Sequence, residues 1–336
     1  MRAYEISGPG GVDALVLSER SEPVPKSGQI KIRIHASSIN YRDLVTIEDP
    51  VARRLPLPRI PNSDCAGEVV EVGTGVTRFK VGDRVMASFF QGWINGEISP
   101  DGMASALGGS LEGVLCEYSV FDEAGVVGIP EHLSYVEAAT LPCAGLTAWH
   151  ALVSCGRIKA GDTVLLLGTG GVSIFALQFC NLHGVRVIIT SSSDEKLSRA
   201  KEMGAWGIIN YCDYPDWQKE VHALTDNNGV DHVVEVGGAG TLERSIESTR
   251  IGGNIYLIGI LAQGEINPTM LMRRSSHLHG IYVGSRAMFE NMNRAIEIAE
   301  LKPLVDRTYN FSDARLAYHF MRAKNHFGKI VIKLDD

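Results

Sequence analysis

The spacing of hydrophobic residues changes near residue 135 and divides the chain into two kinds of pattern. Before that point, short β-like runs alternate with Gly and Pro clusters, as in an antiparallel barrel or sandwich. The runs are residues 30–38, 66–73, 83–90 and 113–121. After it, strand-like and helix-like segments alternate, which indicates a parallel sheet covered on both faces. The predicted strands are residues 163–168, 185–190, 207–211, 231–238, 254–260 and 277–285.

Helical spacing fills the gaps between these strands and dominates the segment that leads into them. The predicted helices are residues 136–153, 171–184, 194–205, 217–229 and 241–253. The tail adds a helix at 287–301 and a closing strand at 328–334. We therefore predict an α/β protein in which a doubly wound parallel-sheet (Rossmann) domain follows a β-barrel domain. The predicted parts are a β-rich first domain of residues 1–125, an alternating α/β domain of 126–284, and a return to the first domain over 285–336.

Composition narrows the class of protein. The net charge of −7 and the sequence pI near 5.8 disfavour a nucleic-acid or anionic-membrane surface. The apolar runs are of strand length, so the sequence predicts no membrane span, and its start lacks the pattern of a signal peptide. The six cysteines are scattered and include no C-x-x-C pair, which is typical of reduced thiols. Together these features predict a cytoplasmic protein.

A glycine stretch, GTGGVS at residues 168–173, lies between the first strand of the alternation and the helix after it. It nearly matches G-x-G-x-x-G, with Ser173 at the third glycine position, where a small side chain suffices. The helix N-terminus offers free N–H groups to phosphate oxygens. The position between strand and helix favours a dinucleotide site over an ordinary turn. The expected contacts are Gly168, Thr169, Gly170, Gly171 and Val172.

The end of the next strand bears on the choice of cofactor. An acidic residue there would bind the ribose 2′-hydroxyl of NAD, but this chain has Thr190 followed by three serines. Hydroxyl groups and Lys196 suit a 2′-phosphate, so we expect NADPH rather than NADH. A structural interpretation stays open for one serine, because Ser192 and Glu195 form an S-x-x-E capping box. The expected contacts are Ser191, Ser192, Ser193 and Lys196.

With these features in place, the whole chain resembles the medium-chain dehydrogenase/reductase superfamily, and most of all its quinone-oxidoreductase-like branch. Three segments carry the resemblance: ASSINYRDL at 36–44, AATLPCAGLTAWHAL at 138–152 and GIINY at 207–211. The resemblance implies a GroES-like barrel domain that holds the substrate site and a Rossmann domain that holds a nicotinamide cofactor. It also implies a homodimer, and we expect the strand at 254–260 to lie at a sheet edge and pair across it.

Zinc alcohol dehydrogenases of this superfamily hold catalytic zinc through a Cys, a His and a second Cys. The matching positions here are Asn40, Ser63 and Cys143, so a single thiol remains. Catalytic zinc requires three protein ligands, so the sequence predicts no metal site. The stretch that matches the structural zinc lobe contains no cysteine. Cys143 is then interpreted as a small buried hydrophobic residue, and His277 with His279 is disfavoured as a metal pair on a buried strand.

Without zinc, hydrogen-bond donors must stabilise the charge that develops on the substrate oxygen. The resemblance places Asn40 and Tyr41 where cofactor and substrate meet, so we predict that both polarise this oxygen and that Tyr41 can donate a proton. The alternative is that the NYRD segment only builds a turn, with Arg42 paired to Asp43. Lys329 in the closing strand is either a phosphate ligand or a solvated charge.

The resemblance implies further cofactor contacts. Thr147 matches a residue near the nicotinamide, and Tyr211 matches a tyrosine near the adenosine phosphate, although Tyr211 also suits packing at a strand end. The carboxyl ends of the fourth and fifth strands are positions where such sheets bind ligands. The residues expected there are Val236, Gly237, Gly259, Ile260 and Leu261.

The leading hypothesis is a zinc-independent oxidoreductase that transfers a hydride from NADPH to a quinone or an α,β-unsaturated carbonyl compound. One alternative is a zinc-type alcohol or aldehyde dehydrogenase with atypical metal ligands. The other is a non-catalytic dinucleotide-binding redox sensor.

Overall fold

The computed structural model describes residues 1–259 and 261–334. The chain forms two compact units. Unit 1 combines residues 1–146 with 283–336, and unit 2 is the continuous segment 147–282. Unit 1 is therefore interrupted by unit 2, as the return of the tail predicts. The first boundary lies later than the predicted residue 125, because β7 (Val126–Gly128) pairs with β5 (Arg84–Ala87) inside unit 1.

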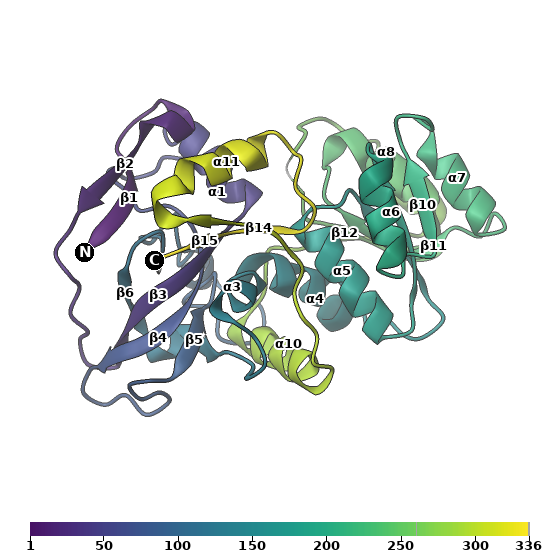
Figure 1. The fold of residues 1–336 in the computed structure, drawn as a ribbon. Coiled ribbons are helices and arrows are strands. Elements are labelled where there is room, and N and C mark those ends of the chain that lie inside the picture. Colours follow the sequence, from purple (N-terminus) through teal and green to yellow (C-terminus); the bar gives the residue numbers. More distant parts are fainter. Residues whose placement is uncertain (260, 335–336) are drawn as a thin grey trace. The chain divides into compact units, whose positions relative to one another are not determined.

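Unit 1 is built on a seven-stranded sheet with the order β14-β15-β3-β4-β5-β7, in which β6 also pairs with β3. The four predicted runs of this region form its strands β3, β4, β5 and β6 (Figure 1). The remaining bounds are β3 (Gln29–Ile39), β4 (Asp64–Val72), β6 (Tyr118–Asp122), β14 (Val305–Asn310) and β15 (Lys329–Lys333). A separate two-stranded sheet, not predicted, pairs β1 (Arg2–Ile6) with β2 (Leu15–Glu19).

The helices of unit 1 are short except in the tail. They are η1 (Gly11–Ala14), α1 (Tyr41–Glu48), α2 (Pro100–Met103), η2 (Glu123–Gly125), α3 (Tyr135–Ala138), η3 (Leu141–Gly145), α10 (Arg286–Ile298), η5 (Phe311–Asp313) and α11 (Ala314–Arg322). The continuous helix predicted over 136–153 is instead a series: α3, the π-helix η3, α4 (Leu146–Trp149) and the π-helix η4 (His150–Cys155). Pro142, which cannot donate a helical hydrogen bond, stands at the start of η3.

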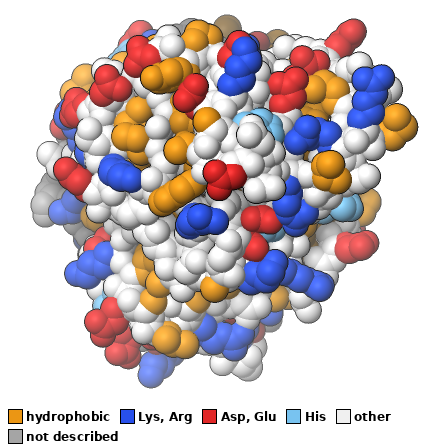
Figure 2. Space-filling view, turned by 90° about the vertical axis from the view of Figure 1, so that its right-hand side faces the viewer, with side chains coloured by type: hydrophobic (Ala, Val, Ile, Leu, Met, Phe, Trp, Pro, Cys, Tyr) orange, Lys and Arg blue, Asp and Glu red, His pale blue; other side chains and the backbone are white. Residues whose placement is uncertain are grey.

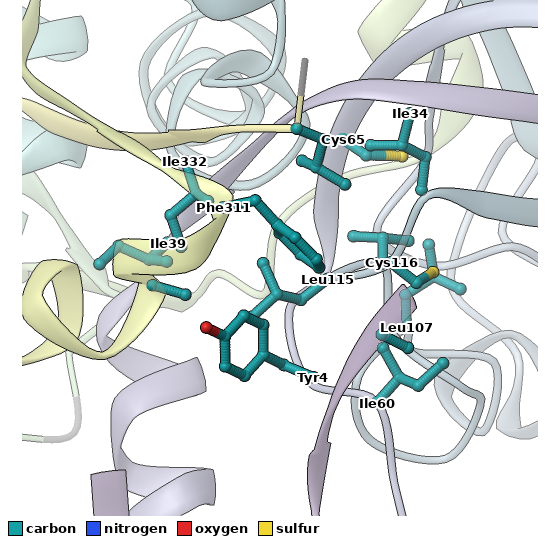
Figure 3. Close-up of a cluster of buried hydrophobic side chains, with 14 of the residues drawn as sticks. Tyr4, Ile34, Ile39, Ile60, Cys65, Leu107, Leu115, Cys116, Phe311 and Ile332 are labelled. Carbon is teal, nitrogen blue, oxygen red and sulfur yellow. The ribbon is translucent and has the colours of Figure 1, made fainter. Parts of the chain in front are cut away.

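The core of unit 1 joins residues from both of its chain segments. Figure 3 shows Tyr4, Ile39 and Phe311 among the buried side chains, together with Ile332 of β15. The rings of Tyr4 and Phe311 meet edge to face, with centroids 5.1 Å apart. Removing this apolar surface from water is what holds the tail against the amino-terminal strands. The tail thus completes the same core that the first strands begin.

Unit 2 is a six-stranded parallel sheet with the order β10-β9-β8-β11-β12-β13 (Figure 1). Numbered along the chain, this is the 3-2-1-4-5-6 order of the Rossmann fold, so the predicted doubly wound sheet is confirmed. The strands are β8 (Thr163–Leu167), β9 (Arg186–Ser191), β10 (Gly207–Asn210), β11 (Val230–Glu235), β12 (Thr249–Leu257) and β13 (His277–Gly280). The helices are α5 (Gly171–Leu182), α6 (Asp194–Glu202), α7 (Trp217–Leu224), α8 (Ala239–Ser248) and α9 (Thr269–Arg274), of which α9 was not predicted.

The expectation that residues 254–260 lie at a sheet edge is wrong for the strand that forms there. β12 pairs with β11 on one side and with β13 on the other. The edge strand next to β12 is β13. It carries an exposed His277 and a half-buried His279, so the prediction that this strand is buried is wrong. These two rings stack on each other at 6.1 Å, and His279 is hydrogen-bonded to Asn254.

The surface carries both signs of charge. On the face shown in Figure 2, Lys and Arg side chains are interspersed with Asp and Glu. None of the helices within residues 1–259 and 261–334 combines the length and the apolarity that a membrane crossing requires.

Candidate functional site

Asn40 stands at the junction between strand and helix in unit 1. It follows β3, precedes α1, and is the N-cap of that helix. Its backbone N–H donates to the Asp43 carboxylate at 2.9 Å, so the NYRD segment does build the helix start that the structural alternative describes. Arg42 and Asp43 lie 3.7 Å apart, as that alternative also expects. Asn40 and Asp43 form a capping box at this helix start, and the side chain of Asn40 is 8% exposed.

A buried chain of hydrogen bonds runs from Asn40 to the start of β4. The Asn40 Nδ2 atom lies 3.5 Å from Ser63 Oγ, and Ser63 donates to Asp64 Oδ1 at 2.6 Å. The backbone N–H of Cys143 donates to the other carboxylate oxygen of Asp64 at 3.1 Å. The three positions that match the zinc ligands of the superfamily therefore do converge in unit 1. Asp64 connects two of them directly.

The backbone before Ser63 is shaped by a polar residue. Asn62 has a φ of 72°, a left-handed conformation that Asn tolerates better than most residues. Its side chain donates to Ser37 at 2.9 Å and accepts from the buried Tyr318 hydroxyl of α11. These bonds keep Ser63 and Asp64 directed toward Asn40.

Lys329 is not a solvated charge in this structure. It is 3% exposed, and its ammonium donates to Asn40 Oδ1 at 2.6 Å and to the Ile39 carbonyl at 2.8 Å. The pairing of β15 with β3, which sets Ile330 opposite Ile39, brings it there. The sequence interpretation missed this because the partner strands are far apart in the chain.

Burial perturbs the titration of this cluster, which we call the Asn40 cluster: Asn40, Ser63, Asp64, Cys143 and Lys329. Loss of hydration raises the pKa of Asp64 to about 6, and Lys329 opposes that rise. The same cause lowers the pKa of Lys329 and raises that of the half-buried Cys143 thiol. The Cys143 side chain is half-buried, whereas the sequence analysis interprets it as a fully buried hydrophobic residue.

The residues of the Asn40 cluster do not fit a zinc ion. Zinc prefers thiolate, imidazole or carboxylate ligands. Here two of the three ligand positions hold a neutral amide and a hydroxyl, so only the Cys143 position offers a side chain that zinc prefers. Lys329 adds a positive charge against the Asn40 side chain. Across residues 1–259 and 261–334, no group of three or more His, Cys, Asp or Glu side chains could hold a metal ion.

Tyr41 is the first residue of α1 and is 39% exposed. Its neighbour Arg42 points into unit 1 instead, donating to the Leu107 carbonyl at 2.6 Å and lying over the Phe89 ring. An exposed tyrosine beside a buried amide is compatible with contact to a substrate. Its catalytic role remains a prediction.

The glycine stretch of unit 2 fits a phosphate group. Gly168 has a φ of 69°, and a Cβ atom added at Gly168 or Gly170 would meet nothing within 4 Å. Gly170 is the N-cap of α5 and contributes no capping side chain, so the first N–H groups of this helix can bind an anion. Ser173 donates to the Leu167 carbonyl at 2.8 Å and ties the helix to its strand. Thr169, Gly171 and Val172 complete the turn and first helical residues.

The serines at the end of β9 and after it have structural roles, and the helix cap is not the serine that the sequence analysis names. Ser193, not Ser192, is the N-cap of α6, and its hydroxyl accepts from the Lys196 backbone. Ser191 is buried, and its Oγ accepts from the Ser193 N–H at 3.2 Å. A hydroxyl that accepts still has a proton to donate, so contact with a cofactor is compatible with these bonds. Ser192 is exposed and Lys196 is partly exposed.

Other predicted cofactor contacts lie at the carboxyl edge of the sheet in unit 2. Tyr211 donates its backbone N–H to Ser191 at 3.0 Å. Gly259 lies against Val236, because a Cβ at 259 would be 1.7 Å from the Val236 carbonyl oxygen. The Ala262 N–H donates to the Gly237 carbonyl at 3.1 Å, which joins the loops after β11 and β12. Thr147 is buried on α4, Leu261 is 52% exposed, and Ile260 lies outside the described residues.

One residue that shapes this edge was not predicted. Glu235 ends β11 and is fully buried. Its carboxylate accepts from the N–H groups of Gly237 and Gly238 and from the hydroxyls of Thr241 and Ser245. It thereby sets the loop that contains Val236 and Gly237. Its signal in the sequence is an acidic residue inside an apolar strand.

A Rossmann sheet with an open glycine turn, in the same chain as an antiparallel unit with a buried polar cluster, is typical of a dinucleotide-dependent oxidoreductase. Residues 26–131 match the alcohol dehydrogenase GroES-like domain, and residues 171–298 match the zinc-binding dehydrogenase family. A zinc-type alcohol dehydrogenase-like protein of Schizosaccharomyces pombe is 39% identical over 97% of this chain and 96% of its own. The chain belongs to the medium-chain dehydrogenase/reductase superfamily, as predicted, and unit 1 is its GroES-like domain.

Relatives with named substrates or cofactors are more distant. Human quinone oxidoreductase is 26% identical over 99% of this chain and 98% of its own. A solved NAD-dependent alcohol dehydrogenase is 32% identical, with a TM-score of 0.90 over 100% of both chains. A mycobacterial protein solved with NADPH is 27% identical, with a TM-score of 0.84 over 99% of this chain and 100% of that chain. Its relatives thus differ in cofactor and substrate.

Proposed function

We propose that this chain is a zinc-independent reductase that uses NADPH to reduce a quinone or an α,β-unsaturated carbonyl compound. The observation that carries the proposal is the Asn40 cluster, in which an amide, a hydroxyl and an ammonium stand at and around the positions of metal ligands. Such a cluster can donate hydrogen bonds to an oxygen but does not supply the ligand set of a Lewis-acid metal. Electrophilic substrates suit it, because they need only weak polarisation.

The dinucleotide, when bound, supplies the hydride. In this proposal the N-terminus of α5 and the glycine turn at 168–172 bind its pyrophosphate. The serines at 191–193, Lys196 and Tyr211 bind the adenosine end, and Thr147 contacts the nicotinamide. The loop at 236–237 follows β11 at the switch point of the sheet, between β8 and β11, where such folds bind ligands, and Gly259 and Leu261 follow the neighbouring strand β12.

The chain's own donors act on the substrate. Asn40 presents its N–H to the carbonyl or quinone oxygen and stabilises the negative charge that develops there. Tyr41 donates a second hydrogen bond from its exposed position and can pass its proton to that oxygen. A simple alcohol is a poor substrate in this arrangement, because nothing lowers the pKa of its hydroxyl.

The test combines metal analysis with a substrate panel. We expect NADPH oxidation with quinones or enones that survives prolonged chelation, well under one zinc per chain, and slow or absent alcohol oxidation. Stoichiometric zinc with chelator-sensitive alcohol oxidation would support the zinc-type alternative instead. NADPH binding without turnover across quinones, enones and aldehydes would support a redox sensor. The proposed enzyme is also expected to be a cytoplasmic homodimer, which sedimentation of the purified protein can check for oligomeric state.

A further inference from the structure

The Asn40 cluster contains one cation, and it lies against the side chain that stands at a metal-ligand position. The Lys329 ammonium is 2.6 Å from Asn40 Oδ1 and 2.8 Å from the Ile39 carbonyl. The groups that interact electrostatically with this ammonium are the buried carboxyls of Asp43 and Asp64 and the Cys143 thiol. An ammonium in this environment is paired with opposite charge, which compensates for its burial.

The ammonium also determines which way the Asn40 amide points. Because Lys has donors and no acceptor, the amide atom facing it must be the oxygen. Nδ2 therefore faces Ser63, whose own hydroxyl proton is already directed to Asp64. The distance of 3.5 Å between Nδ2 and Ser63 Oγ is long for a hydrogen bond. The Asn40 N–H groups are thus turned away from Lys329 and toward Ser63 and the carboxyls of Asp43 and Asp64, whose pKa values hydrogen bonding by the Asn40 side chain lowers.

We infer that Lys329 takes the place of the metal charge: it orients the amide of Asn40 and keeps a divalent cation out of the cluster. In this assignment Lys329 is a positioning residue, because it acts on substrate only through Asn40. The effect on Asn40 rests on the proposed function. The exclusion of metal does not, and it can be measured without any substrate.

The first experiment restores metal ligands around Lys329. The double variant Asn40→Cys with Ser63→His supplies a Cys, a His and Cys143, yet we expect weak zinc binding while the ammonium remains. Adding Lys329→Met should raise zinc affinity by at least about tenfold, because a like charge next to the ion is removed. Competition with a chromophoric chelator measures both affinities. Equal affinities would overturn the exclusion of metal by Lys329.

The second experiment keeps Asn40 and changes only the lysine. Lys329→Met should lower kcat for a quinone by about tenfold or more, while the KM values for quinone and NADPH stay within about twofold. A purely structural role would lower the melting temperature without this split. An unchanged kcat in the folded variant would overturn the positioning role. Lys333→Met, an exposed position on the same strand, is the matched control and should change nothing.

If Lys329→Met does not fold, Lys329→Gln takes its place in both experiments. The Gln amide can donate the same two hydrogen bonds without the charge. It carries the same expectation for zinc affinity, because the charge is removed, but its kcat should stay close to the wild-type value, because the hydrogen bond that orients Asn40 is kept. If the wild-type protein reduces no quinone or enone, the proposed function fails, and the zinc measurement alone decides the assignment of Lys329.

Discussion

The two candidate regions of this protein differ in whether side chains or backbone atoms form them. The Asn40 cluster of unit 1 is made of side chains that are mostly buried and bonded to one another. The glycine turn of unit 2 is made of backbone, and the space beside Gly168 and Gly170 is open. A side-chain site depends on the identity of each residue, whereas a backbone site depends on conformation and on room. The two regions should therefore respond differently to substitution.

The largest expected effect is in unit 1. Tyr41→Phe keeps the ring and deletes the hydroxyl, and losing one donor to a developing oxyanion costs about a hundred- to a thousandfold in kcat. Steady-state kinetics on the best quinone or enone measure it. Tyr118→Phe, the same deletion on β6, is the control and should leave kcat unchanged. A loss below about threefold for Tyr41→Phe would reduce Tyr41 to a packing residue.

Acid titration should also distinguish the buried cluster. Burial raises the folded-state pKa of Asp64 to about 6, well above the usual range of an aspartate. The folded state therefore holds this proton more tightly, and the resulting stability is complete below pH 4 and lost as pH rises through 6. Relative to Asp64→Asn, the wild-type free energy of unfolding should fall by about 2–3 kcal/mol between pH 4 and pH 7.

Denaturant unfolding of both proteins across this pH range is the measurement. Asp101→Asn makes the same change at an exposed position of unit 1 and serves as the control. Parallel pH curves for the wild type and Asp64→Asn would mean that Asp64 is not desolvated in the folded protein.

In unit 2, Gly170→Thr should weaken dinucleotide binding and leave the free energy of unfolding nearly unchanged. Gly170 has φ −78° and ψ −178°, which Thr adopts readily, and Thr is about as good an N-cap as Gly. The unfolding free energy should change by less than about 1 kcal/mol. The side chain would nevertheless fill the space in front of the helix, and losing two charge-assisted hydrogen bonds weakens dinucleotide binding by at least about a hundredfold.

Calorimetric titration and denaturant unfolding test the two halves of this prediction. Gly128→Thr on β7 is the matched control, because a Cβ there also meets nothing within 4 Å. If Gly170→Thr unfolds the protein, or binds the dinucleotide normally, the contrast between the two regions fails.

The smallest effect concerns the choice between the two cofactors. Lys196→Ala should weaken NADPH binding about ten- to a hundredfold, the value of one charge-assisted hydrogen bond, and should hardly change NADH binding. Lys201→Ala, on the same helix, is the control. Equal losses for the two cofactors would remove Lys196 as the 2′-phosphate ligand, and a wild-type preference for NADH would overturn the interpretation of residues 190–193.

The sheet of unit 2 could be predicted from the sequence because each strand and its crossover helix are neighbours in the chain. The glycine turn was predictable for the same reason. The strand β13 at the edge was misjudged, since periodicity does not report which strand pairs last. The strand β14 was missed because its half-exposed positions give no clear period. The helix α11 was missed although its buried residues recur at helical spacing, at 314, 317, 318 and 321.

The candidate site in unit 1 could be predicted only in part. The resemblance located Asn40, Ser63 and Cys143, and these positions do converge. The roles of Asp64 and Lys329 could not be predicted, since they depend on a strand pairing between distant segments. By our inference, the ligand-restoring variant Asn40→Cys with Ser63→His therefore needs the further change at Lys329 to bind zinc well.

The distance along the chain between Asn40 and Lys329 has a consequence for synthesis. The two residues are 289 positions apart, with all of unit 2 between them. At a rate of 5–20 residues per second, a ribosome takes roughly 15–60 s to deliver the lysine after the asparagine. Throughout that interval Asp43 and Asp64 lack their buried cation, while unit 2 is already available as one continuous segment. We therefore expect nascent unit 1 to stay open, and accessible to chaperones, until β15 emerges and pairs with β3.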